Sequence, residues 1–161
     1  MKTVLQSEHK WLHKLLGEWR VTMGPTAAEG KGPSHPEWTE SVRSLEGGLW
    51  VVAESRGEMP GGESGTTIMT LGYDTARKRF VGTFVGSMMD CLWVYEGVLD
   101  EGDKSVTLDT VGPDFEGGGK LVRYRDTIAF RDDDHRDLSS RMLGDDGAWK
   151  LVMTAHYSRK R

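Results

Sequence analysis

Short β-prone segments, separated at regular intervals by turn residues, dominate this chain from Glu18 onward. Each segment is rich in β-branched and aromatic residues, and the separators are rich in Gly and Asp, which favour hairpin turns. This spacing predicts antiparallel strands, each paired with the next one along the chain. We expect strands at about 18–23, 37–45, 49–57, 66–73, 78–87, 91–99, 104–110, 120–130, 135–143 and 148–158.

An open sheet of ten such strands would leave two long unpaired edges, which promote aggregation. Closure into a barrel removes both edges, so the sequence predicts an all-β, ten-stranded antiparallel barrel. One short helix at about 7–16 precedes it, with Ser7 as the N-cap and Gly17 at its end. The length of 161 residues suits one domain over 1–161, with the barrel at about 18–159.

Composition excludes several classes of partner. The 21 basic and 25 acidic residues give a net charge of −4. The chain has no long basic run of the kind that binds nucleic acid. No apolar run approaches the roughly 20 residues of a membrane helix, and the N-terminus lacks the apolar stretch of a signal peptide. The lone Cys91 excludes an internal disulfide. We therefore expect a cytoplasmic protein with neither a nucleic-acid nor a membrane partner.

Alternation along two strands predicts which side chains face the barrel interior. Between 120 and 130, the more apolar face includes Tyr124 and Asp126. An interior carboxyl is costly unless it is paired or meets a polar ligand. In the last strand His156 is expected to face outward, and the inward set is Trp149, Leu151, Met153, Ala155 and Tyr157.

Two segments, 49–52 and 91–95, are apolar on both faces. Such strands are expected to be covered on their outer side as well. The N-terminal helix or a second subunit could cover them, which leaves a homodimer open.

A resemblance to a known family rests on four segments, His9–Val21, Leu71–Met88, Tyr124–Arg136 and Asp146–Arg161. The chain is similar to the bacterial domain-of-unknown-function 1579 family, small calycin-like barrels related to the lipocalin and fatty-acid-binding-protein group. This resemblance implies a barrel with an interior cavity and carries over no catalytic residue. Where the family often has an Asp after an aromatic-Val pair, this chain has Gly86, and Asp90 is the substitute candidate.

Metal and cofactor patterns are weak in this sequence. His9 and His13 have a spacing that can hold a metal, but no third ligand is evident. The acidic run at 132–134 before His135 lacks the EF-hand spacing and is typical of a solvated turn. The related nitrobindin barrels bind haem through a C-terminal histidine, yet alternation turns His156 outward unless a bulge intervenes. We therefore predict no cofactor and no metal.

Large aromatic and Met side chains on the strands suit a pocket for a flat or apolar molecule. The leading hypothesis is non-covalent binding of a small hydrophobic or aromatic molecule inside the barrel. The alternatives are an enzyme that uses buried Asp126 or Glu54 as a general acid or base, and an interaction protein with a filled barrel. The segment 23–36 is either an ordered lid or a loop. The predicted ligand-binding residues are Glu54, Trp93, Tyr95, Tyr124, Asp126, Met142 and Tyr157.

Overall fold

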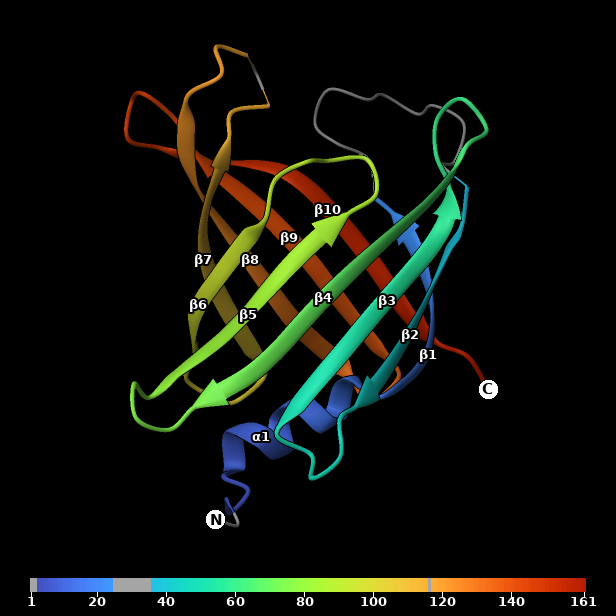
Figure 1. The fold of residues 1–161 in the computed structure, drawn as a ribbon, viewed down its shortest axis with the longest axis vertical. Helices are drawn as coiled ribbons and strands as arrows, with labels where there is room; N and C mark the ends of the chain where they lie inside the picture. Colours follow the sequence, from blue (N-terminus) through green and yellow to red (C-terminus); the bar gives the residue numbers. More distant parts are fainter. Residues whose placement is uncertain (1–2, 25–35, 116) are drawn as a thin grey trace.

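The computed structural model describes residues 3–24, 36–115 and 117–161 and confirms a closed ten-stranded antiparallel barrel (Figure 1). Each strand pairs with its neighbours in the chain, and β1 closes the barrel by pairing with β10. The helical segment consists of α1 (Ser7–Leu12) and the 3-10 helix η1 (His13–Leu15). The strands are β1 (Gly17–Met23), β2 (Trp38–Ser44), β3 (Trp50–Glu58), β4 (Ser64–Asp74), β5 (Arg79–Gly86), β6 (Trp93–Leu99), β7 (Ser105–Pro113), β8 (Leu121–Asp132), β9 (His135–Leu143) and β10 (Trp149–Arg159).

The turns have the backbone conformations that their residues favour. Gly102, between β6 and β7, has φ of 89°, and Gly147, between β9 and β10, has φ of 81°. A residue with a Cβ is strained at such angles, whereas Gly adopts them freely. The Gly and Asp separators in the sequence are therefore hairpin turns, as predicted.

The helix closes one end of the barrel, below the strands in Figure 1. The Trp11 ring packs edge-on against Phe130, with 5.5 Å between ring centroids, and against Phe80 at 6.1 Å. Its indole Nε1 donates to the backbone oxygen of Asp103, in the β6–β7 turn, at 2.9 Å. These contacts anchor the helix over the barrel end. No helix among the described residues is long and apolar enough to cross a membrane.

The start of α1 differs from the prediction by one residue. Its N-cap is Gln6 rather than Ser7, and the Gln6 backbone N–H donates to His9 Nδ1 at 2.9 Å. Because His9 Nδ1 accepts this bond, its Nε2 carries the proton and donates to the backbone oxygen of Tyr73 at 3.2 Å. His9 is thus a buried structural residue that joins the helix to β4.

The interior half nearest the helix, here called the closed half, is filled. Arg136 is only 3% exposed and donates to Glu40, whose second oxygen accepts from Ser55 at 2.7 Å. The Arg136 guanidinium also lies 3.9 Å from the ring centroid of Tyr157 and 4.6 Å from that of Trp19. The charge is therefore paired and stacked, and the void beside these residues is only about 20 Å³.

A bulge in β10 overturns part of the predicted facing. The register with β9 shifts between Leu151 and Met153. Beyond the shift Met153 faces inward as expected, but Leu151 is 47% exposed, and the Trp149 ring carries the Arg125 guanidinium at 4.4 Å on the outer face. The prediction that Trp149 and Leu151 point inward is wrong, because one extra residue reverses a two-residue alternation.

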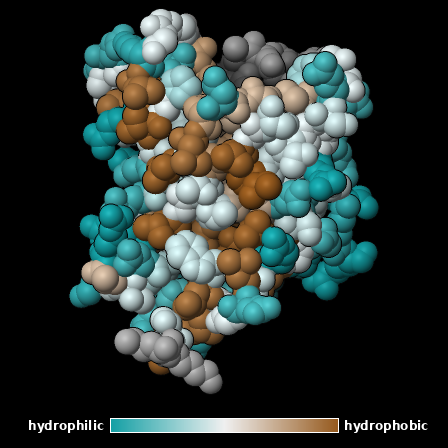
Figure 2. Space-filling model, in the orientation of Figure 1, coloured by the Kyte–Doolittle hydropathy of each residue, from teal (hydrophilic) through white to brown (hydrophobic). Residues whose placement is uncertain are grey.

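The outer faces of the segments 49–52 and 91–95, which the sequence analysis found to be apolar on both faces, include exposed side chains. Trp50 is 41%, Leu92 58% and Val94 60% exposed. Figure 2 shows apolar side chains gathered over the face formed by β4, β5 and β6. The helix packs over the barrel end (Figure 1), so of the two alternatives left open, the helix and a second subunit, the helix does not cover these strands.

Candidate functional site

The interior half of the barrel away from the helix, here called the hollow half, contains a cavity of about 420 Å³. Its position follows from its lining, which includes residues from the strand ends and loops opposite α1. Most of these side chains are apolar or aromatic. The lining residues are Met69, Phe84, Met89, Trp93, Tyr95, Thr110, Phe115, Tyr124, Asp126, Leu138, Ser140, Val152 and Met153.

Three aromatic rings form one wall of the cavity. Trp93 lies 5.1 Å from Tyr124 and 5.9 Å from Phe115, and Phe115 lies 5.8 Å from Tyr124, between ring centroids. The Tyr124 hydroxyl donates to the Pro113 backbone oxygen at 2.5 Å, which fixes that ring. Trp93 lies directly over Gly112 of β7, where an added Cβ would come within 1.9 Å of the indole ring. The absence of a side chain at Gly112 therefore makes room for Trp93.

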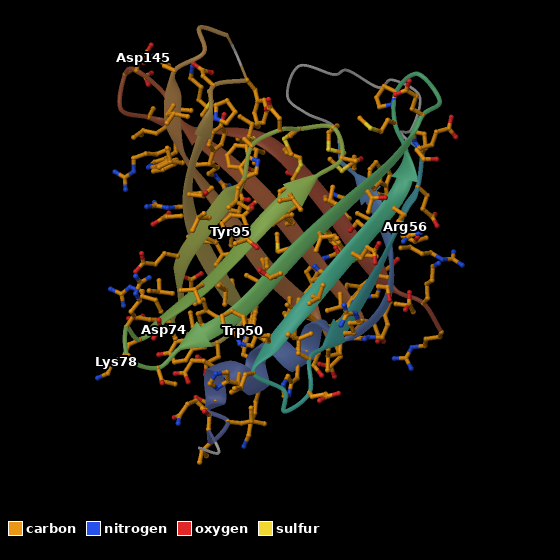
Figure 3. All side chains as sticks on the ribbon, in the orientation of Figure 1. Trp50, Arg56, Asp74, Lys78, Tyr95 and Asp145 are labelled. Carbon is orange, nitrogen blue, oxygen red and sulfur yellow. The ribbon has the colours of Figure 1, made fainter. Side chains whose placement is uncertain are left out.

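A carboxyl group supplies the main polar feature of the lining. Asp126 is 8% exposed, and its Oδ2 accepts a hydrogen bond from the Tyr95 hydroxyl at 2.6 Å; Figure 3 labels Tyr95. Burial raises the pKa of Asp126, because desolvation disfavours its charged form, while the nearby Ser140 hydroxyl and the hydrogen bond from Tyr95 act in the opposite direction. Burial likewise raises the pKa of the Tyr95 phenol well above its usual value, so Tyr95 remains a neutral donor.

Three polar atoms of the cavity-lining residues lack a partner with hydrogen-bond geometry among the described residues. They are Trp93 Nε1, Thr110 Oγ1 and Asp126 Oδ1. Buried polar atoms in folded proteins are nearly always hydrogen-bonded, so a cluster of exceptions needs an explanation. A polar group of a bound molecule is one partner that such a cluster can take.

The predicted binding residues divide between the two halves of the barrel. Met142 is buried and packs with Trp93 and Tyr124 outside the cavity lining. Tyr157 belongs to the closed half, against Arg136. Those that line the cavity are Trp93, Tyr95, Tyr124 and Asp126.

Glu54 does not face the interior, and its prediction as an interior carboxylate is wrong. In β3 the buried positions are Val51, Ala53 and Ser55, which leaves Glu54 on the outer face. There it pairs with Arg56 at 2.8 Å, and Figure 3 shows Arg56 directed away from the barrel. Of the two carboxyls considered for acid–base chemistry, only Asp126 lines the cavity.

The sequence analysis missed lining residues of two kinds. Met89 and Phe115 come from the β5–β6 and β7–β8 connections, where alternation makes no prediction. Thr110 and Ser140 lie on strands, where residues an even number of positions apart face the same side. Thr110 lies two residues after the buried Leu108, and Ser140 lies four residues after the buried Arg136, so both face inward. Only this second kind had a signal in the sequence.

The histidines that raised the question of metal or haem lie elsewhere. His13 Nε2 lies 2.8 Å from the Gly48 backbone oxygen, a different partner from that of His9. His156 is on the outer face of β10, where its Nδ1 pairs with Asp137 at 2.6 Å, so it does not reach the cavity. Within the described residues, no three metal-ligating side chains converge. Most of the candidate lid at 23–36, namely 25–35, lies outside the described residues.

The fold and the cavity define the chain as a closed antiparallel β-barrel with a hollow interior half. Residues 4–159 match the model of the DUF1579 family, whose description is a protein of unknown function, and the chain belongs to that family. No curated protein sequence matches it.

Several solved structures are similar to this chain. The S-type phycobiliprotein lyase CPES from Guillardia theta is 16% identical with a TM-score of 0.56, over 98% of this chain and 94% of that chain. A redesigned β-barrel is 11% identical with a TM-score of 0.47, over 92% and 94%. The protein EF1p2_mFAP2b bound to DFHBI is 12% identical with a TM-score of 0.46, over 94% and 98%. At such identities the CPES similarity shows a common fold.

Proposed function

We propose that this protein binds a small hydrophobic or aromatic molecule, non-covalently, in the hollow half of the barrel. The observation that carries the proposal is the cavity of about 420 Å³ with its apolar and aromatic lining. Sites for small molecules are commonly concave, of roughly 300–1,000 Å³, and mostly apolar with a few placed polar groups.

The contrast between the two halves supports this function over a filled barrel. The closed half is packed around Arg136 and Trp19 and leaves a void of about 20 Å³. A barrel that served only as a scaffold would gain stability from comparable packing at both ends, because cavities are destabilising. Retention of a large cavity favours a binding role.

Native mass spectrometry of the protein purified from cells tests the proposal directly. We expect extra mass on the folded chain that disappears after denaturation. The purified protein should also bind the neutral dye N-phenyl-1-naphthylamine saturably at one site, with enhanced dye fluorescence, because the lining is apolar.

Two adjacent substitutions on β10 provide a matched pair for the dye measurement. Met153→Trp adds bulk inside the cavity, whereas Thr154→Trp adds the same side chain to the outer face, opposite Ser139. We expect Met153→Trp to abolish dye binding and Thr154→Trp to preserve it. Absence of both a retained molecule and saturable dye binding, or equal binding by the two variants, would contradict the proposal.

A further inference from the structure

We propose that the cavity selects an apolar amine, bound as its ammonium ion with Asp126 as counter-ion, over neutral or anionic molecules of the same shape. This inference rests on the proposed function, because it specifies the chemical class of the molecule in the same cavity.

The first observation is the charge of the cavity wall. Among the described lining residues, Asp126 is the only carboxylic acid, and none is Lys, Arg or His. The interior base Arg136 is committed to Glu40 in the closed half. The lining therefore offers no basic side chain to an anionic head group, whereas it offers a carboxylate to a cation.

The second observation is the incomplete pairing of that carboxylate. Tyr95 donates to Oδ2, and Oδ1 has no partner with hydrogen-bond geometry among the described residues. The nearby Ser140 hydroxyl favours the charged form of Asp126 without reaching that geometry. Both hydroxyls are uncharged, so neither neutralises the carboxylate. A buried carboxylate without a cation is costly, and an ammonium donor in the same cavity removes much of this cost.

The surroundings of Asp126 suit a cation that carries an apolar body. The aromatic rings of Trp93, Tyr124 and Phe115 line the same cavity. Aromatic faces attract ammonium groups, especially where water is excluded, and they also bury apolar groups. Thr110 Oγ1, which has no partner in the described part of the chain, can accept a further ammonium hydrogen.

Three probes that differ only in the head group test the inference: 1-naphthylmethylamine, 1-naphthylmethanol and 1-naphthoate. Their dissociation constants for the full chain at pH 7.5 can be measured by calorimetry. We expect the amine to bind at least about tenfold more tightly than the alcohol, since it makes a charge-assisted hydrogen bond, and the carboxylate to bind most weakly.

Asp126→Asn keeps the shape of the side chain and removes its charge. We expect this variant to lose the tenfold preference for the amine while retaining the alcohol. Glu54→Gln is the matched control, because it removes a carboxylate from the outer face and should leave the preference unchanged.

The results separate this inference from the proposed function. If the alcohol or the carboxylate binds as tightly as the amine, or if Asp126→Asn retains the preference, the ammonium inference is overturned while ligand binding stands. If none of the three probes nor the neutral dye binds, the proposed function fails with it. Should Asp126→Asn not fold, the order of affinities in the unmodified chain decides the matter.

Discussion

The ion pair in the closed half makes a sharp prediction about stability. Arg136→Met removes a guanidinium that is 3% exposed and keeps an unbranched side chain of similar length. The variant leaves the Glu40 carboxylate, in a residue that is 7% exposed, with Ser55 as its hydrogen-bond donor. It also removes the cation stacked on Tyr157 and Trp19.

The expected loss follows from the burial of both partners. Removing one member of a buried ion pair leaves an uncompensated charge and costs about 3–5 kcal/mol. Folded domains are stable by about 5–15 kcal/mol, so this is a large fraction of the total. For a chain of this length, about 2–4 °C per kcal/mol converts the loss into a fall in Tm of about 6–20 °C.

Urea unfolding followed by tryptophan fluorescence measures the loss, since Trp19 reports on the site itself. The double variant Arg136→Met with Glu40→Leu replaces both charges by apolar groups, and such replacements are often neutral or stabilising. We therefore expect it to recover at least about 2 kcal/mol relative to Arg136→Met alone. The reasoning would be refuted if Arg136→Met unfolded within about 1 kcal/mol of the unmodified chain, or if the double variant were as unstable as the sum of the two single variants.

Three further predictions concern the cavity and the helix. Burial raises the folded-state pKa of Asp126 above its unfolded value, so the folded chain binds this proton more tightly and loses stability as pH rises from about 4 toward neutral. Tyr95 and Tyr157, whose pKa values are raised, stay neutral in that range and do not contribute to this change. Because Asp126→Asn removes the titrating group, the variant should be more stable near pH 7 and its stability should depend less on pH. Urea unfolding at several pH values measures this, and an unchanged profile would contradict it. Gly112→Ala places a Cβ within 1.9 Å of the Trp93 ring, so we expect a loss of about 1–3 kcal/mol and a shifted tryptophan emission maximum, whereas an unchanged spectrum would be evidence against the contact. Trp11→Ala should lower the free energy of unfolding by about 3–5 kcal/mol in thermal unfolding, because it removes the ring and hydrogen-bond contacts that hold the helix on the barrel. A loss below about 1 kcal/mol would show that the helix is not anchored there.

Alternation and turn chemistry predicted the barrel because both act over a few neighbouring residues. In β8 the buried positions Tyr124, Asp126 and Ile128 alternate with partly exposed ones, as the sequence indicated. The hydrogen-bonded ladder of an antiparallel pair enforces this two-residue period. Where the period is intact, the facing of a strand can be predicted from its residues.

The facing of Trp149 and Leu151 could not be predicted in the same way. A bulge adds one residue to a strand, and nothing in the local composition marks where it falls. Glu54 failed for a related reason, because β3 is apolar on both faces over Trp50–Val52 and polar on both faces over Glu54–Arg56, so its sequence offers no clear apolar face there. In such strands the partner strands fix the orientation, and the sequence of one strand does not contain that information.

The hollow half itself leaves a trace in the sequence once the interior positions are known. Along β7 the buried positions are Val106, Leu108, Thr110 and Gly112, so the interior side chains become small toward the end that lies away from α1. In β9 the interior position beside the cavity is also small, namely Ser140, whereas Arg136 lies in the closed half and the buried Met142 follows Ser140. A barrel wall of fixed radius filled by shrinking side chains must leave space, unless a neighbouring side chain takes it, as Trp93 does over Gly112. The cavity therefore exists because the interior side chains around it are small. Substitution of Thr110 or Ser140 by Leu should fill part of this space, which reduces ligand binding and increases the stability of the empty barrel.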